Sequence, residues 1–225
     1  MFTNMPSKVQ FEGRPVWAEV KLGALTHNLR SIQRHLASRR KAAGSRAGRP
    51  KILAVVKANA YGHGAVSVAR ALGKAGADWF GVTCSAEGIE LREGGIRKPI
   101  LLLTGFWEGE EKLVIQHDLT PAVTRCEQLL PLDRAAARAR RSRFSFHLKI
   151  DTGMNRLGIA PADVACFAKT LANCPHLRLG GIFTHFASSE EFTHDKTEQQ
   201  CRVFEAALER LRELEYIAAR YGRPG

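Results

Sequence analysis

Short apolar runs alternate with amphipathic segments along most of the chain. Leucine and isoleucine fall at steps of three and four across residues 22–36, which is the spacing of one helix face. A polar, glycine-containing stretch, residues 41–50, separates this segment from residues 52–56, a continuous apolar run of the kind buried in a parallel sheet. The pattern predicts a leading helix followed by a buried strand.

The alternation then repeats to the end of the chain. Strands are predicted at residues 52–56, 79–83, 100–104, 121–124, 144–150 and 179–186. One helix begins at Ser85, as its cap, and ends at Gly94-Gly95; the others are predicted at residues 65–74, 108–116, 126–140, 163–172 and 195–220. Six strand–helix units after a leading helix are typical of an α/β fold with a parallel sheet.

Two architectures share this alternation, the doubly wound sheet and the (β/α)8 barrel. The glycine-rich fingerprint of dinucleotide-binding folds is absent after the first strand, which weakens the first option. A closed barrel needs eight strands and typically about 250 residues. With six units in 225 residues, we expect an incomplete barrel whose last two units would lie past Gly225.

The chain has a formal net charge of +12, which raises the question of a nucleic-acid partner. Its densest basic run, residues 134–143, lies on an alanine-rich helical stretch without interleaved aromatic residues. A solvated helix face is the simpler interpretation of such a run. We therefore expect an enzyme for small anionic molecules, or part of a chain that is acidic elsewhere, and no nucleic-acid partner.

Cysteine spacing and hydropathy address the compartment. Five cysteines, an odd number with no CxxC pair, predict reduced and mostly buried thiols rather than a disulfide framework. No apolar leader is visible at the N-terminus, and no apolar run approaches membrane-spanning length. The expectation is a soluble, cytoplasmic protein with no membrane partner.

The most informative segment is residues 54–64, AVVKANAYGHG. Lys57 stands at the carboxyl end of a predicted strand, which is where α/β barrels carry out chemistry. Partial desolvation there would lower the pKa of the amine and help it form a Schiff base with an aldehyde. On position alone, a lysine that reaches solvent or pairs with a carboxylate is the simpler interpretation.

The whole string changes that judgement, because it resembles the pyridoxal-phosphate attachment motif of the alanine racemase family. The resemblance implies that Lys57 forms the internal aldimine with pyridoxal 5'-phosphate and acts as one of two catalytic bases. It also implies that Tyr61 lines the cofactor site. Gly62 and Gly64 would let the backbone turn close to the cofactor.

Residues 147–158, HLKIDTGMNRLG, resemble the family's second signature, with Asn155 where glycine is often found. A guanidinium is suited to bidentate binding of a carboxylate. The resemblance implies that Arg156 contacts both the substrate carboxylate and the phenolic oxygen of the cofactor. Lys149, which is carbamylated in some family members, would help to orient Arg156.

Residues 180–187, GGIFTHFA, resemble the family's THFA motif, which places His185 beside the cofactor ring. A lone histidine on an apolar strand is otherwise a satisfied core residue. Residues 79–92 resemble the family's second strand and helix, with Ser85 near the cofactor. His194 and Asp195 lack metal-ligand spacing, so no metal is expected.

The resemblance runs from about Trp17 to the end, so residues 1–225 are interpreted as the N-terminal cofactor-binding barrel, truncated before its last two units and a C-terminal β domain. In the family the second catalytic group is a tyrosine from that domain, contributed across a homodimer interface. Tyr61, Tyr216 and Tyr221 do not match it. The expected function is racemisation of L-alanine to D-alanine for peptidoglycan, with little or no activity in this chain alone.

Two alternatives remain open. A racemase of the same fold for serine, lysine or arginine would share the cofactor chemistry, which the motifs define better than the side-chain pocket. A non-catalytic barrel that binds pyridoxal phosphate would suit the length, but AYGHG and DTGMNRLG are racemase-like and the predicted barrel does not close.

Overall fold

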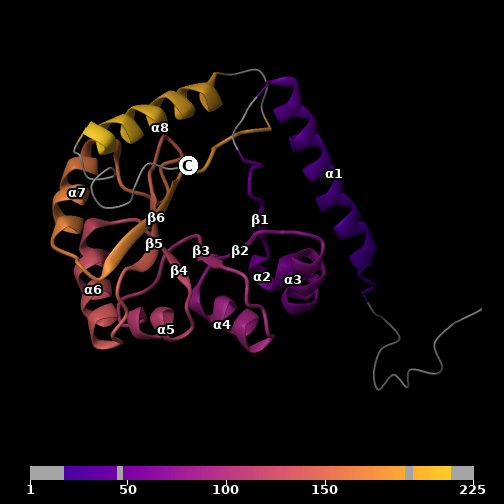
Figure 1. Ribbon diagram of the computed structural model, residues 1–225, viewed down its shortest axis with the longest axis horizontal. Helices are drawn as coiled ribbons and strands as arrows, with labels where there is room; N and C mark the ends of the chain where they lie inside the picture. The colour runs from indigo at the N-terminus through magenta and orange to yellow at the C-terminus, as the bar shows by residue number, and fades with distance from the viewer. Residues whose placement is uncertain (1–17, 45–47, 191–194, 214–225) are drawn as a thin grey trace, which may run out of the picture.

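The computed structural model describes residues 18–44, 48–190 and 195–213. Its strands form one parallel sheet in which each strand pairs with its neighbours in sequence (Figure 1). The strands are β1 (Leu53–Val55), β2 (Trp79–Val82), β3 (Ile100–Leu102), β4 (Thr120–Val123), β5 (Phe144–Lys149) and β6 (Leu177–Phe183). Within the described residues β1 and β6 do not pair with each other, so the sheet is an open arc of a (β/α) barrel.

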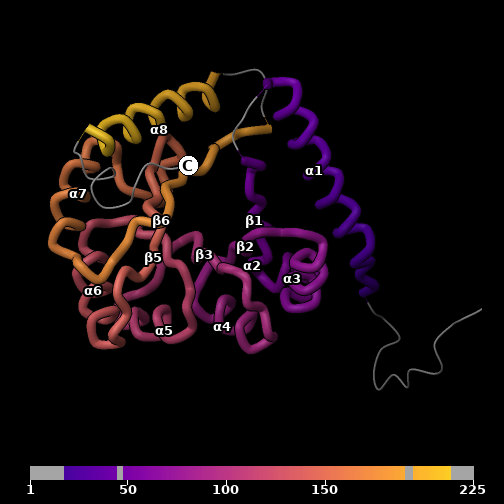
Figure 2. Tube along the Cα trace, in the orientation of Figure 1, coloured from indigo at the N-terminus to yellow at the C-terminus, as the bar shows by residue number. Residues whose placement is uncertain are grey.

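Helices follow the outer side of this arc, and α1 and α8 stand at its two ends in the trace of Figure 2. Two short 3-10 turns, η1 (Cys126–Gln128) and η2 (Pro161–Asp163), lead into the sixth and seventh helices. The helices are α1 (Leu22–Ala42), α2 (Lys57–Gly62), α3 (Ala65–Lys74), α4 (Ser85–Glu93), α5 (Glu111–Gln116), α6 (Leu129–Arg138), α7 (Val164–Ala172) and α8 (Lys196–Glu213).

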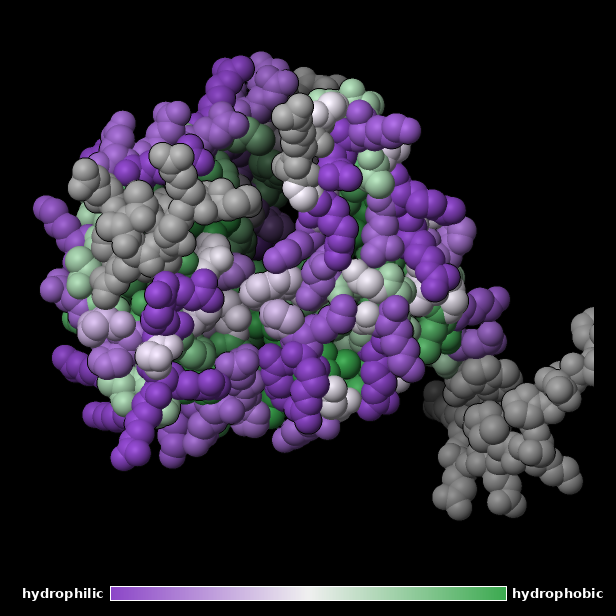
Figure 3. All heavy atoms as spheres, viewed as in Figure 1, coloured by the Kyte–Doolittle hydropathy of each residue, from purple (hydrophilic) through white to green (hydrophobic). Residues whose placement is uncertain are grey.

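Alternation along β5 shows how the layers are built. Phe144, Phe146 and Leu148 are buried, and the ring of Phe146 meets that of Phe167 on α7 edge to face, with centroids 6.2 Å apart. Because successive side chains of a strand point to opposite faces, the alternate residues of β5 face the inside of the arc. In Figure 3 hydrophilic side chains cover most of the outline of the molecule, and apolar ones show between them.

The predicted α/β barrel with six units is confirmed, and the helix at residues 65–74 has the predicted bounds. Ser85 does not cap α4 as expected: it is the first helical residue, and its hydroxyl donates to Glu110 Oε1 at 2.7 Å. The helix expected from residue 108 begins at Glu111, because the amide of Trp107 donates to the Glu110 carboxylate and holds a turn there. Residues 214–220 of the last predicted helix lie outside the described residues.

All five cysteines are free thiols, as expected, but the expectation that most are buried is wrong. Cys174 alone is buried, Cys166 on α7 is exposed, and the other three are intermediate. Among the described helices, none combines the length and apolar character needed to cross a membrane.

Candidate functional site

Lys57 lies two residues past the end of β1 and begins a turn that was not predicted from the sequence. Residues 58–61 have φ between 50° and 55° and ψ between 39° and 52°, a left-handed helical turn made without glycine. For L-residues this conformation costs about 1–2 kcal/mol each. Such strain persists only where the surroundings enforce it, and it gathers at functional sites.

Glu87 on α4 supplies much of that enforcement. Its carboxylate accepts the amide of Ala58 at 2.7 Å and the amide of Thr83, after β2, at 2.7 Å. The side chain of Asn59 accepts the amide of Ala65 at 2.7 Å, which joins the turn to the start of α3. The turn is therefore fixed by α4 and α3, and it fixes the position of Lys57 in return.

The left-handed turn brings Tyr61 back beside Lys57. The Lys57 ammonium nitrogen lies 5.9 Å from the centroid of the Tyr61 ring, within the range of a cation–π contact. Tyr61 is 59% exposed, so its phenol is available to a ligand. The structure thus brings together two of the residues that the sequence analysis assigned to the cofactor.

Lys149 is the last residue of β5 and is only 4% exposed. Its Nζ lies 5.6 Å from the centroid of the Phe183 ring, an apolar neighbour that offers it a π face. Burial lowers the pKa of Lys149, and the charges of Arg156 and Lys57 lower it further against the opposing pull of Asp151. A buried ammonium with this environment favours loss of its proton.

The loop after β5 is built around Asp151. Its carboxylate accepts the amides of Gly153 and Asn155 at 3.0 Å each. Burial raises the pKa of Asp151, but these two amides and those of Met154 and Arg156 together outweigh it, and the net shift is downward. Asn155 has φ +57°, a left-handed conformation that asparagine tolerates, so it serves where the motif often has glycine.

Gly158 closes this loop where no side chain fits. A Cβ built on it would lie 2.6 Å from the amide nitrogen of Asp151, and its φ is +139°. The amide of Asp151 in turn donates to Ile159 O at 3.0 Å. The loop is thereby folded back on β5, and it carries Arg156 to the carboxyl edge of the sheet.

His185 was predicted to lie on the sixth strand, but it lies two residues past the end of β6. Gln200 of α8 holds it in place: its Nε2 donates to His185 O and to Thr152 Oγ1, both at 3.0 Å. The hydroxyls of Thr152 and Thr184 are 2.8 Å apart. This network joins the loop after β5 to the segment after β6.

Electrostatics show that these side chains share one region. Partial burial lowers the pKa of His185, and the charges of Arg156, Lys149 and Lys57 lower it further. The three cations come from β5, from the loop after it and from the segment after β1. A cluster of this kind stabilises an anion and keeps the nearby imidazole neutral.

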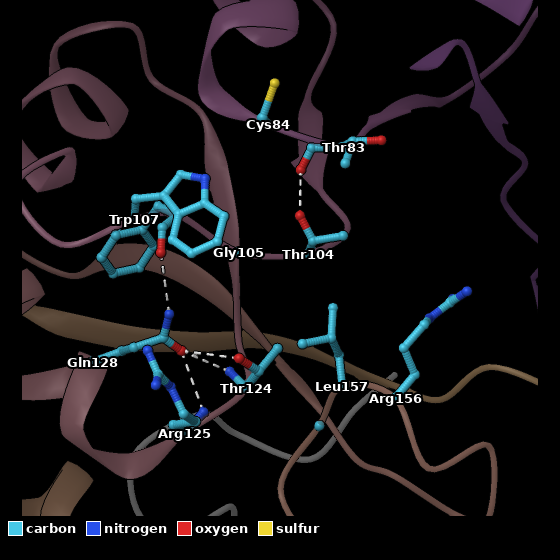
Figure 4. A pocket seen from close by; sticks show the side chains of 12 residues that line it. Thr83, Cys84, Thr104, Gly105, Trp107, Thr124, Arg125, Gln128, Arg156 and Leu157 are labelled. Atoms are coloured by element: carbon cyan, nitrogen blue, oxygen red, sulfur yellow. Dashed lines mark hydrogen bonds between the residues drawn. The ribbon is translucent and has the colours of Figure 1, made fainter. Parts of the chain in front are cut away.

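A cavity of about 600 Å³ adjoins this cluster through Arg156 (Figure 4). Its other walls follow β2, β3 and β4, where Gln128 Oε1 accepts the amides of Thr124 and Arg125 at 2.9 and 3.2 Å. The volume suits a small-molecule ligand. This wall was not predicted from the sequence: it is formed by Thr83, Thr104, Trp107, Thr124, Arg125 and Gln128. The usable signal was the position of the three threonines, each at the carboxyl end of a predicted strand.

The expectation that Ser85 lies near the cofactor finds no support in this region. The Ser85 hydroxyl is engaged by Glu110 and buried, so it offers nothing to a ligand. Over residues 18–44, 48–190 and 195–213, no three histidine, cysteine or acidic side chains group as metal ligands would. His194 lies outside the described residues.

Comparison with known proteins gives the same result by sequence and by structure. Residues 20–221 match the family model described as alanine racemase, N-terminal domain. An alanine racemase of Symbiobacterium thermophilum is 42% identical over 198 residues, which cover 88% of this chain and 49% of that protein. The chain therefore spans about half the length of the curated relatives it matches.

Two solved structures extend the comparison. Alanine racemase from Bacillus anthracis with bound L-Ala-P superposes with a TM-score of 0.74 at 30% identity, over 86% of this chain and 47% of that one. The enzyme from Bartonella henselae, with covalently bound pyridoxal phosphate, gives 0.72 at 26% identity, over 84% and 52%. Both share the arc of strands that carries Lys57, Lys149 and Arg156 here, and the chain belongs to the alanine racemase family.

Proposed function

We propose that the protein to which this chain belongs racemises alanine with pyridoxal 5'-phosphate, carried on Lys57. The observation that supports this most is the meeting of Lys57, Lys149, Arg156 and His185 at one end of the sheet. Three cations without a matching number of acids fit a cofactor with an anionic phosphate and a phenolic oxygen. When bound, pyridoxal phosphate supplies the electron sink for the carbanion that forms at the substrate Cα.

Lys57 has the chemistry for two tasks. Its amine reacts with an aldehyde, and once free it removes or returns a proton on one face of the substrate Cα. The main chain at Lys57 is held in place while its side chain reacts, because the amide of the next residue, Ala58, donates a hydrogen bond to Glu87. The proton acceptor is thus positioned by a strained but fixed segment.

Arg156 and Lys149 form the anion-binding part of the proposed site. The exposed guanidinium of Arg156 binds the substrate carboxylate and the phenolic oxygen of the cofactor. We also propose that Lys149 is carbamylated: a buried amine with a lowered pKa is the neutral nucleophile that carbon dioxide needs. The modification replaces a positive charge by a negative one and gives Arg156 a partner that orients it.

His185 and Tyr61 complete the proposed cofactor site. A lowered pKa keeps the His185 imidazole neutral near pH 7, so it packs on the cofactor ring without adding a fourth cation. Tyr61 lies beside Lys57 with an exposed phenol that donates to an anionic group of the cofactor.

The second acid–base group is proposed to come from the half of the relatives that this chain does not span. Racemisation needs groups on both faces of Cα, and Tyr61 lies on the same side as Lys57. Tyr216 and Tyr221 lie outside the described residues. We propose residues 1–225 as the N-terminal barrel domain of a cytoplasmic homodimer in which a tyrosine of a C-terminal β domain acts across the interface. The D-alanine formed would supply peptidoglycan.

Borohydride trapping tests the cofactor assignment. The chain is mixed with pyridoxal phosphate and reduced, and the modified peptide is mapped by mass spectrometry, with circular dichroism as a control for folding. We expect a pyridoxyl group on Lys57, its loss in Lys57→Ala, and no change in Lys74→Ala on the exposed side of α3. Labelling spread over surface lysines, or none in either this chain or a chain extended to the length of the relatives, overturns the proposal.

A racemisation assay separates the alternatives. The full-length protein is given L-alanine, L-serine, L-lysine and L-arginine in turn, and formation of the D-enantiomer is followed. Preference for alanine supports the proposal, whereas preference for another substrate identifies a different racemase of the same fold. No turnover with a Lys57 adduct identifies a non-catalytic cofactor-binding barrel. Robust turnover by the 225-residue chain alone contradicts the proposed need for a second half.

A further inference from the structure

A second cavity, of about 380 Å³, lies at the amino ends of the strands, whereas Lys57 lies at their carboxyl ends. Its walls are the amino ends of β2 to β5 and the start of β6. Five arginines line it against a single carboxylate, Asp118, and we call it the arginine pocket: Arg92, Arg97, Arg141, Arg143 and Arg178. All of these residues lie on segments within the matched barrel, so the pocket is built by this chain itself.

Arg92 has a structural task that explains its presence. Its guanidinium donates to four backbone carbonyls, of His117, Ile96, Lys98 and Asp118, at 2.8–2.9 Å. These bonds tie α4 to the segments that precede β3 and β4. Arg92 is therefore part of the wall and leaves its neighbours to meet a ligand.

Arg178 has no such task. It stands on β6 opposite Ser145 of β5 and is half-buried. No hydrogen bond or ion pair joins its guanidinium to another residue in the part of the chain that the structure describes. The donors of this half-buried guanidinium are therefore left for water or for an anion from outside.

The arginines of the pocket lower the pKa values of two neighbouring groups, Arg92 and His147. The pKa of Arg92 is lowered by its burial and by Arg97, although Asp118 opposes the shift. The pKa of His147, inside the arc, is lowered to about 4 by burial and by Arg178. Asp118 is already shared, since Arg141 Nη2 lies 3.0 Å from its Oδ1. Positive charge thus exceeds negative charge from the rim to the inner wall.

We propose that the arginine pocket binds a small phosphate-bearing anion, with Arg178 as the inner ligand and Arg97 and Arg141 at the rim. Guanidinium groups bind phosphate oxygens bidentately, and the three have donors left to do so. The hydroxyls of Ser142 and Ser145 on the same wall add neutral donors. The volume accommodates a diphosphate or a nucleotide.

This site is independent of the proposed racemase function, because it lies at the amino ends of the strands and uses none of the residues at their carboxyl ends. Its test must nevertheless distinguish it from the Lys57 cluster, which is also cationic. The probe is inorganic pyrophosphate, titrated by calorimetry into the full chain at about 0.1 M salt, where distant surface charges are largely screened. ADP forms a second arm, and tighter binding than pyrophosphate would add a base contact, with Trp79 as the aromatic residue on the wall.

Three variants identify the site. Arg178→Gln should weaken pyrophosphate binding about tenfold or more, the effect of losing a charge-assisted hydrogen bond. Arg202→Gln, an equal charge loss on the exposed face of α8, should change it by less than about twofold. Arg156→Gln in the Lys57 cluster should leave it unchanged. The exposed Arg141→Gln gives the same answer as Arg178→Gln if the inner variant does not fold.

Three results would overturn the proposal. The first is a titration without saturable heat. The second is equal weakening by Arg178→Gln and Arg202→Gln, which would show general charge attraction. The third is loss of binding in Arg156→Gln with none in Arg178→Gln, which would assign the anion to the Lys57 cluster instead.

Discussion

Gln200 offers the sharpest test of how the site is held together. It lies on α8 with 4% of its surface exposed, and its amide bridges two loops that carry predicted site residues. Its Oε1 accepts the amide of Ala187 at 2.9 Å, and its Nε2 donates to Thr152 and His185. Gln200→Ala removes all three hydrogen bonds at once, and alanine preserves the helix propensity of α8.

The expected loss of stability follows from what each partner does next. A buried group left without a partner costs about 1–3 kcal/mol. Thr152 keeps its hydrogen bond to Thr184, and His185 and Ala187 are exposed residues, so we expect water to replace part of the loss. We therefore expect about 2 kcal/mol, near the low end of the sum for two stranded backbone groups.

Urea unfolding followed by circular dichroism measures this quantity. With a slope of about 2–3 kcal/mol per molar urea, the midpoint should fall by roughly 0.7–1 M. The matched control is Gln199→Ala, the adjacent exposed residue of the same helix, which should stay within about 0.5 kcal/mol. Equal, small changes in both variants would show that the bridge contributes nothing and that the two loops are held by other contacts.

Three further perturbations test other parts of the structure. Gly158→Ala should cost about 3 kcal/mol or more in urea unfolding, because its Cβ meets the Asp151 amide and its φ of +139° suits only glycine. His147 stays neutral in the folded state down to about pH 4, whereas the unfolded chain binds its proton near 6.5, so stability present above pH 6.5 should fall by up to about 3 kcal/mol as pH drops to 4. Iodoacetamide at pH 8 should label exposed Cys166 far faster than Cys126, whose thiol pKa is raised to about 11 by burial and by Cys166 itself; peptide mapping decides.

Matched variants isolate the cause in each case. Gly95→Ala places alanine at an unfavourable φ of +81° where its Cβ meets no other atom, so it should lower the free energy of unfolding by only about 1 kcal/mol. An equal loss in Gly95→Ala and Gly158→Ala would show that the contact with Asp151 contributes nothing. His147→Asn should flatten the stability profile between pH 6.5 and 4, and exposed His35→Asn should not. Equal labelling rates for the two cysteines would refute the raised thiol pKa of the partly buried Cys126.

The order of strands could be predicted because each buried strand leaves an apolar run in the sequence. The sequence also carries the two faces of β5, because Phe144, Phe146 and Leu148 on the helix side alternate with Ser145, His147 and Lys149 on the inside of the arc. The left-handed turn after Lys57 could not be predicted, because its residues include two alanines and no glycine. Its cause is Glu87, which lies 29 residues from Ala58 in sequence and reaches it only once α4 is packed.

Ser85 failed as a predicted cap for a related reason. A serine before an apolar helix is a sound local signal for capping, but Glu110 offers its hydroxyl a carboxylate from a different unit. The wall of the larger cavity is likewise assembled from the ends of β2, β3 and β4, so Thr104, Trp107 and Gln128 carry no shared local pattern. Local signals thus identify elements, while contacts between units decide which side chains remain available.

The basic run at residues 134–143 shows where a linear interpretation of charge reaches its limit. Arg134 and Arg138 lie exposed on α6, as a solvated helix face requires. The helix ends at Arg138, however, and the turn into β5 directs Arg141 and Arg143 to the arginine pocket. The same stretch therefore holds two kinds of arginine, and only the helix end separates them. If the pocket binds phosphate, part of the +12 net charge is explained by ligand binding rather than by solubility.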